Sequence, residues 1–187
     1  MNRLFSIMSK KSVIQIFILV INLGFYIILG YFTERSDFVL IMCLYSVLFL
    51  IYFFILYNKY FDNSFRMAFI SAIVFRFSLL LMTPNLTDDY FRYIWDGLLF
   101  TGGENPYLVM PFEYITSPTV VPGIDVRLYE NLNSPYYYTA YPPFTQLIFG
   151  FSTGISAQDV YSNLLILRGI CFLAVFRLYQ SLCFYNH

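Results

Sequence analysis

Two uncharged apolar runs constrain the fold of this chain more than any other feature of its sequence. Residues 13–32 (VIQIFILVINLGFYIILGYF) and residues 38–57 (FVLIMCLYSVLFLIYFFILY) contain no charged side chain. Crossing the hydrocarbon core of a bilayer takes roughly 20 apolar residues in a helix, so each run predicts a membrane-spanning helix. The composition agrees, because 59% of the 187 residues are hydrophobic and only 12% are charged. The first run is also too long for a cleaved signal peptide, and no small-residue cleavage site follows it.

Less regular apolar segments follow at residues 67–82, 144–156 and 164–185. A long polar segment, residues 83–143, separates the first of these from the other two. We therefore expect an all-α fold: a single polytopic membrane helix bundle over residues 1–187, whose outer loop contains an amphipathic interfacial helix. Because the sequence stops within an apolar run, we also expect the chain to be the N-terminal portion of a longer protein.

The charge distribution predicts which side of the membrane each segment faces. Basic residues cluster before the first run and between the second and third segments, as is typical of cytoplasmic loops: Arg3, Lys10, Lys11, Lys59 and Arg66. The charged side chains of residues 83–143 are instead mostly acidic. Three spans from a cytoplasmic N-terminus place this segment outside, so charge and span count agree. A net charge of zero gives no reason to expect a nucleic-acid partner.

Residue types that commonly bind metals are scarce. The only histidine is His187, which argues against a histidine-dependent triad or a histidine-rich metal site. The cysteines Cys43, Cys171 and Cys183 lie in apolar runs without metal-ligand spacing. We interpret them as small buried hydrophobic residues.

The stretch TDDYFRYIWDG, residues 87–97, concentrates charge in a chain that has little of it. Projected on a helix, four charged side chains and Tyr93 share one face: Asp88, Asp89, Arg92 and Asp96. The opposite face is apolar and includes Trp95. This segregation predicts an amphipathic helix over residues 88–100 that lies on the membrane surface, with its acidic face in water and Trp95 at the interface.

Ordinary helix capping explains part of this cluster. Thr87 suits the N-cap, and Gly97 or the pair Gly102-Gly103 would end the helix. Acidic residues in a first helical turn interact favourably with the helix dipole, by ~0.3–1 kcal/mol. Arg92 lies four residues from two of the aspartates, so simple i,i+4 pairs are also available. Capping does not require a third carboxylate, so a chemical role of the first two aspartates stays open.

Two further motifs lie in the same polar segment. GGENPY, residues 102–107, joins a glycine pair to Asn105-Pro106, which favours an extended or turn geometry, and Tyr107 follows. Tyr141-Pro142-Pro143 predicts a rigid start of the next helix. The tyrosines around it form either an aromatic belt at the membrane surface or a platform for sugar rings: Tyr136, Tyr137, Tyr138 and Tyr141.

Arg76 interrupts the third apolar segment, about two helical turns before residue 83. An arginine inside a span is costly and is therefore a functional candidate. Its long side chain could instead extend to the outer headgroups, which that depth permits. It could also pair with an acidic residue of the loop.

Taken in order, Arg76…LTDDYFRYIWDG…GGENPY…YPPFTQLIF resembles a known family. The pattern is similar to that of the GT-C superfamily of membrane glycosyltransferases, in particular its bacterial polyprenyl-phosphate-sugar-dependent mannosyltransferase-like members. The likeness runs from Arg76 to Phe149, which is 74 of the 187 residues. The linked combination is specific, whereas each element alone is weak. Members of this family are longer and have more spans, and the resemblance implies a location in the bacterial cytoplasmic membrane.

The resemblance implies transfer of a hexose such as mannose from a polyprenyl-phosphate donor to an acceptor hydroxyl of a glycan, lipid or protein. Asp88 or Asp89 would be the general base. Arg92 or Arg76 would face the leaving phosphate, and Asp96 would orient Arg92. No cofactor is required, although a divalent metal at the two adjacent aspartates is possible. Further substrate contacts would come from Tyr93, Trp95, Asn105, Tyr107 and Tyr141.

Two alternative functions are compatible with the sequence. In a catalytically inactive fragment or assembly subunit, the acidic loop would only pack against a partner. A transporter of a lipid-linked sugar would instead need ionisable residues deep within several spans. The carboxylates of this chain lie in a loop, which favours the enzyme over the transporter.

Overall fold

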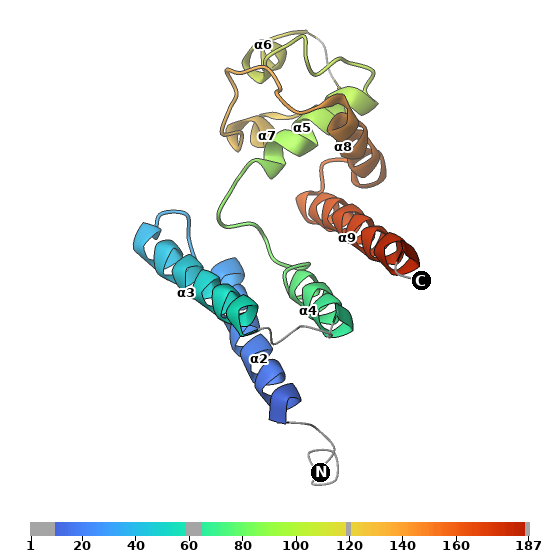
Figure 1. Cartoon of the computed structure of the whole chain (residues 1–187). Coiled ribbons are helices and arrows are strands. Elements are labelled where there is room, and N and C mark those ends of the chain that lie inside the picture. Colours follow the sequence, from blue (N-terminus) through green and yellow to red (C-terminus); the bar gives the residue numbers. More distant parts are fainter. Residues whose placement is uncertain (1–9, 59–64, 119–120, 186–187) are drawn as a thin grey trace. The chain divides into compact units, whose positions relative to one another are not determined.

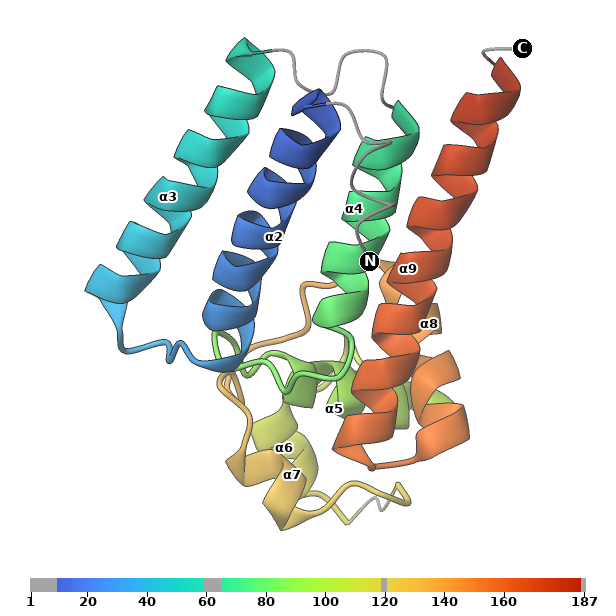
Figure 2. The same cartoon turned by 90° about the horizontal axis from the view of Figure 1, so that it is seen from below.

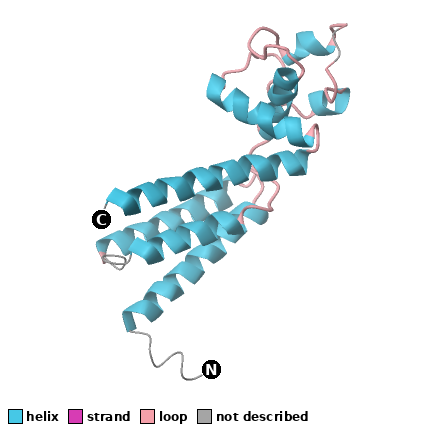
Figure 3. Cartoon of the chain, turned by 90° about the vertical axis from the view of Figure 1, so that its right-hand side faces the viewer, coloured by secondary structure: helices cyan, strands magenta, loops and turns pink. Residues whose placement is uncertain are grey.

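The computed structural model describes residues 10–58, 65–118 and 121–185, and every regular element within these ranges is a helix (Figure 3). The chain divides into two compact units, Met1–Leu86 and Thr87–His187. The first unit holds α2 (Lys10–Tyr31), α3 (Phe38–Tyr57) and α4 (Phe65–Ser78) (Figure 1). The second holds α5 (Tyr90–Thr101), α6 (Pro111–Ile115), α7 (Val126–Glu130), α8 (Pro143–Ser156) and α9 (Val160–Tyr185). The predicted all-α fold is confirmed, while Arg3, Lys59 and His187 lie outside the described residues.

Three of the described helices are long and apolar enough to cross a membrane: Lys11–Tyr31, Phe38–Tyr57 and Val160–Ser181. The first two match the predicted spans, and Figure 2 shows α2 and α3 side by side and running in opposite directions. Large hydrophobic side chains stand out from both helices; Phe17 is 65% exposed and Leu50 is 68% exposed. Apolar faces of this kind mark contact with lipid or with another protein. The chain is therefore an all-α membrane protein whose helices contact lipid.

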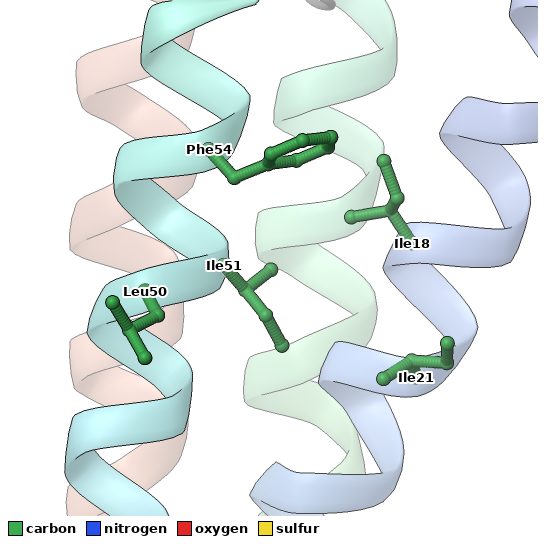
Figure 4. Close-up of a pocket in the computed structure, with 5 residues that line it drawn as sticks. All are labelled: Ile18, Ile21, Leu50, Ile51 and Phe54. Atoms are coloured by element: carbon green, nitrogen blue, oxygen red, sulfur yellow. The ribbon is translucent and has the colours of Figure 1, made fainter.

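A groove of about 310 Å³ separates the facing sides of α2 and α3 (Figure 4). It is lined by Ile18 and Ile21 of α2 and by Leu50, Ile51 and Phe54 of α3. Every lining side chain is a hydrocarbon, so the groove offers no hydrogen-bonding group to a polar reactant. We assign it to the lipid-facing surface and not to the chemistry of the protein.

The shorter apolar helices differ from the three candidate spans. α4 and α8 have 14 residues each, which corresponds to about 21 Å of helix against a hydrocarbon core of about 30 Å. Membrane crossing by the segments at residues 67–82 and 144–156 therefore stays a prediction. α9 begins at Val160, four residues before the predicted span, because Asp159 accepts the Ser162 backbone N–H at 2.8 Å and caps the helix.

The cysteines correct one prediction. Cys43 in α3 and Cys171 in α9 are exposed, although we expected buried hydrophobic residues. Both lie on helices that are long and apolar enough to cross a membrane, where an exposed position can face lipid. The side chain of Cys183 lies outside the described residues.

α5 forms the centre of the second unit. Its side chains Ile94, Trp95, Leu98 and Leu99 are each at most 3% exposed. They pack in one cluster with residues from α6, α7 and the connecting loops: Tyr114, Val121, Leu128 and Leu132. The predicted position of Trp95 at the membrane interface is wrong, because these later segments cover the apolar face of α5.

α5 also packs closely along α8, and a glycine permits this approach. A Cβ atom on Gly97 would lie only 2.6 Å from the backbone oxygen of Phe149. Gly97 is therefore an interior packing position, and its predicted role as a helix end is wrong. The alternative end is confirmed, because Gly102 caps α5 and donates its N–H to Leu98 O at 2.9 Å.

The start of α5 differs slightly from the prediction. The N-cap is Asp89 and not Thr87, and α5 begins at Tyr90. Thr87 lies two residues before this N-cap, and its Oγ1 accepts the Asp89 N–H at 3.2 Å. The sequence pattern therefore located the helix correctly but placed its cap two residues too early.

Candidate functional site

Two charged side chains of the predicted polar face, Arg92 and Asp96, are buried, contrary to the expectation that this face lies in water, whereas Asp88 and Asp89 are partly exposed. Arg92 is 3% exposed and Asp96 is fully buried. Arg92 Nε donates to Asp96 Oδ1 at 2.9 Å, so the two side chains form an ion pair one helical turn apart. A polypeptide segment far along the chain covers this face. Helical periodicity alone cannot predict that a distant segment of the chain packs on this face.

The covering segment hydrogen-bonds to both partners of the ion pair, although the buried Arg92 Nη2 has no hydrogen-bond partner among the described residues. Arg92 Nη1 donates to the backbone oxygens of Ser134 and Tyr137, both at 3.0 Å. Asp96 Oδ2 accepts from Thr139 Oγ1 at 2.5 Å and from Gln146 Nε2 at 3.0 Å. A buried charge is tolerated only when it is paired and hydrogen-bonded in this way. The network therefore holds the loop and the start of α8 against α5.

Asp89 is the N-cap of the same helix, but its side chain lies in a different environment. It is partly exposed, and its Oδ1 accepts from Asn133 Nδ2 at 2.5 Å. Asn133 comes 44 residues later in the chain, immediately before the segment held by Arg92. The carboxylate is thus fixed by tertiary structure and still reachable from solvent.

Three aromatic rings pack beside this carboxylate. The rings of Tyr93 and Phe149 stack with centroids 4.7 Å apart, and Tyr141 meets Tyr93 edge-on at 5.1 Å. Burial, followed by the negative charge of Asp89, raises the pKa of Tyr93 above 10.0. Burial, the neighbouring Tyr93 phenol and the charge of Asp89 raise the pKa of Tyr141 in the same direction. Like an ordinary phenol, both are neutral near pH 7, and both lie near Asp89.

Asp88 occupies a separate neighbourhood although it is adjacent in sequence. It is partly exposed, and its charge, second to burial, raises the pKa of Tyr90. The pKa changes of Tyr93 and Tyr141 involve Asp89 and do not involve Asp88. Within the described residues no group of three or more acidic, histidine or cysteine side chains is placed to hold a metal ion.

The GGENPY turn docks onto the Tyr-Pro-Pro motif. Asn105 Oδ1 accepts the Tyr107 N–H at 3.0 Å, which closes the turn. Tyr107 OH then donates to the backbone oxygen of Tyr141 at 2.5 Å. The two motifs, separate in sequence, are thereby joined next to the aromatic cluster.

The tyrosines after Pro135 point outward from this framework. Tyr136, Tyr137 and Tyr138 are between 55% and 71% exposed. The ring of Tyr136 packs on Phe112 with centroids 5.0 Å apart. Their exposure fits either interpretation given for them, an aromatic belt or a platform for sugar rings.

Arg76 belongs to α4 in the other unit. It is exposed on α4, and its Nη1 donates to Ala72 O at 3.1 Å, one turn earlier in the same helix. The described contacts therefore assign it to α4, and its pairing with the acidic loop stays a prediction.

The structure also brings side chains to the candidate site that the sequence did not point to. Asn133 and Thr139 contact the aspartates from a loop, where no periodicity marks them. Gln146 offered a clearer signal, because it is the polar residue in the otherwise apolar run QLIFGF at the start of α8. An amide inside an apolar helix usually has a buried partner, which here is Asp96.

Searches against models of known protein families, against curated proteins and against solved structures each returned no match. Function is therefore inferred from the residues that the fold brings together.

Proposed function

We propose that the protein is a membrane glycosyltransferase that moves a hexose such as mannose from a polyprenyl-phosphate donor to an acceptor hydroxyl. The reaction would take place on the extracytoplasmic side of a bacterial cytoplasmic membrane, with the N-terminus in the cytoplasm. The observation that carries this proposal is Asp89, a partly exposed carboxylate fixed by Asn133 and flanked by neutral phenols. In the chain it follows directly after a unit of apolar helices, which suits a lipid-linked substrate.

The chemistry needs a base that is positioned before the substrate arrives. The acceptor hydroxyl gives its proton to the carboxylate while its oxygen attacks the anomeric carbon of the donor sugar. The bond from that carbon to the phosphate oxygen breaks, and the polyprenyl phosphate leaves with the electron pair. A carboxylate held at one oxygen by an amide keeps its second oxygen for this proton. We therefore favour Asp89 over Asp88 as the base.

The leaving phosphate needs positive charge, and the burial of Arg92 is a reason to favour Arg76 for this role. Arg92 is buried and donates to Asp96 and to two backbone oxygens, so its guanidinium holds the loop in place. Arg76 is exposed and remains available to a phosphate. We assign Arg92 a positioning role and propose Arg76 for contact with the donor phosphate.

The test is sugar transfer from a radiolabelled polyprenyl-phosphate mannose by the complete protein in membranes. Asp89→Asn is expected to lower the initial rate by about 100-fold or more, since general-base catalysis contributes typically 10²–10⁴-fold. Asp88→Asn is expected to retain more activity than Asp89→Asn. Transfer at the wild-type rate in both variants would rule out a catalytic role for either aspartate.

The matched control is Glu130→Gln, which removes one carboxylate of the same segment at an exposed position. This variant should transfer sugar at the wild-type rate. Adding a chelator tests the possible divalent metal at Asp88 and Asp89. An inactive chain that still assembles with a second, active subunit would instead support the assembly-subunit function.

A further inference from the structure

A second groove lies between the GGENPY turn and the start of α8. Its volume is about 460 Å³, within the range of roughly 300–1,000 Å³ that small-molecule pockets occupy. Its lining includes Glu104, Asn105 and Gln146, and does not include Asp88 or Asp89. The groove is therefore distinct from the carboxylate site described above.

Backbone and side-chain contacts fix the shape of this groove. Glu104 donates its N–H to Leu99 O at 2.9 Å, and Gly103 adopts a left-handed conformation with φ +83° that turns the chain back. The bond from Tyr107 OH to Tyr141 O closes the other side. The groove is thus preformed, and a ligand entering it would not have to order the turn.

One set of lining residues offers apolar surface. Phe100 is 42% exposed, Tyr107 is 36% exposed and Leu147 is 54% exposed. Rings at such positions can take the face of a pyranose, where C–H groups form an apolar surface. The hydroxyl groups of the pyranose would then point away from these rings.

Another set offers hydrogen-bonding groups. Glu104 is exposed, and its carboxylate accepts only. Asn105 Oδ1 is occupied by the Tyr107 N–H, so the amide Nδ2 is the group it can offer as a donor. Gln146 is 2% exposed, and its Nε2 binds Asp96 and Thr139 while its buried Oε1 has no hydrogen-bond partner among the described residues. That oxygen is enclosed by the protein, so Glu104 and Asn105 are the polar side chains that the groove offers to a ligand.

The charge of the lining narrows the class of ligand. Glu104 is the charged side chain that the described part of the chain places in the groove, where no arginine, lysine or histidine accompanies it. A phosphate or a carboxylate would meet repulsion there. The combination of ring faces, acceptors and one amide donor instead fits a neutral polyhydroxylated ring.

We propose that this groove binds a neutral pyranose ring, with Phe100 and Tyr107 against its apolar face and Glu104 and Asn105 toward its hydroxyls. This binding stands independently of the proposed function.

An apolar stripe continues from the groove along α8. Leu147, Phe151 and Ile155 are spaced one turn apart and are 54%, 59% and 64% exposed. A hydrocarbon chain attached to the sugar would lie on this stripe and gain burial of apolar surface. The preferred ligand is therefore a pyranose carried on a lipid chain, and a free saccharide is the alternative source of the same ring.

Binding can be measured without any donor. The intact chain in phosphatidylcholine nanodiscs, purified without glycoside detergents, is titrated with methyl mannopyranoside and with octyl mannopyranoside by saturation-transfer NMR. Empty nanodiscs give the background for the octyl probe. Both probes should bind saturably, and octyl mannopyranoside should bind about 10-fold more tightly or better because of its apolar chain. Equal affinities for the two probes would still support a pyranose site, and would identify its ligand as a water-soluble saccharide.

Two variants test the lining directly. Glu104→Met and Asn105→Asp should each weaken binding of both probes by about 5-fold or more, because the first removes the acceptor and the second removes the amide donor. Glu130→Gln should bind as the wild type does. Unchanged affinity in both lining variants, or no saturable binding of either probe, overturns the site. Retained binding in a chain that never transfers sugar would overturn the proposed function and leave the groove assignment intact.

Discussion

Arg92 and Asp96 form an ion pair at 2.9 Å whose side chains are 4% and 0% exposed. The pair lies on the face of α5 that its own sequence would assign to water. Arg92 connects α5 to two loop carbonyls, and Asp96 connects it to Thr139 and Gln146. These contacts make the pair the main polar link between α5 and the segment that carries Asn133.

Removing one member of this pair should be costly. Arg92→Met or Asp96→Asn alone is expected to lower the free energy of unfolding by ~3–5 kcal/mol, because each leaves a buried charge without its partner. The double variant removes both charges, so its loss should be smaller than the sum of the two single losses. Trp95, the only tryptophan, is buried beside the pair and reports unfolding by its fluorescence. Losses that add within about 0.5 kcal/mol would show that the two side chains are not coupled.

Asn133→Ala should reduce sugar transfer without unfolding the protein. The substitution removes the amide that holds Asp89 Oδ1, and hydrogen bonds to charged groups contribute about 1.5–3 kcal/mol. We expect the rate to fall about 10-fold or more. Asn131→Ala is the control, since its Nδ2 bonds only to Arg127 O within α7 and its cap. Equal rates of sugar transfer in the two variants would show that Asn133 has no specific role in the reaction.

Gly97→Ala tests the close approach of α5 and α8. In an isolated helix this change would stabilise by about 0.8–1.0 kcal/mol. Here the added methyl group would lie 2.6 Å from Phe149 O, so we expect a net destabilisation of about 1–3 kcal/mol. Gly169→Ala in α9 is the matched control, because a Cβ there meets nothing within 4 Å. Stabilisation by both changes would mean that the two helices are not packed as described.

Alkaline pH should weaken the fold through its buried phenols. The pKa of Tyr141 is raised above its ordinary value of 10.0, first by burial and then by Tyr93 and Asp89. Above about pH 10 the unfolded chain therefore loses this proton more readily than the folded protein does. The stabilising contribution is complete below pH 10 and declines as the pH rises beyond it. Unfolding measured from pH 8 to 11 should show this decline, and Tyr141→Phe should make it shallower.

Sidedness can be tested with single cysteines. The native cysteines are first replaced by serine, since Cys43 and Cys171 are exposed. Glu130→Cys should then react with a membrane-impermeant thiol reagent in intact cells, whereas Lys11→Cys should react only after lysis. Both positions are exposed in the structure, so accessibility within the protein does not explain a difference. The reverse pattern would invert the proposed topology.

The sequence predicted helices well and their surroundings poorly. The spans at residues 13–32 and 38–57 were identifiable because length and apolar composition are local properties. The helical register of Arg92 and Asp96 was also predicted correctly, since a period of 3.6 residues fixes which side chains share a face. What covers that face is set by Thr139 and Gln146, more than 40 residues away. No local pattern encodes a contact of that kind.

The same limit explains the two misplaced residues of α5. Trp95 seemed suited to a membrane interface because its ring is amphipathic, but the later helices supply enough apolar surface to bury it. Gly97 was considered as a helix end because glycine often ends helices. Its actual role depends on Phe149, which the sequence gives no means of placing beside it.

Arg92 recognises the loop at residues 134–137 through carbonyl oxygens and not through side chains. Every amino acid presents the same carbonyl, so this attachment is indifferent to the identity of the residues it holds. The three outward tyrosines can therefore be exchanged, by mutation or by evolutionary drift, while the path of the loop is retained. A surface of this kind can acquire a new recognition specificity without rebuilding the framework that displays it.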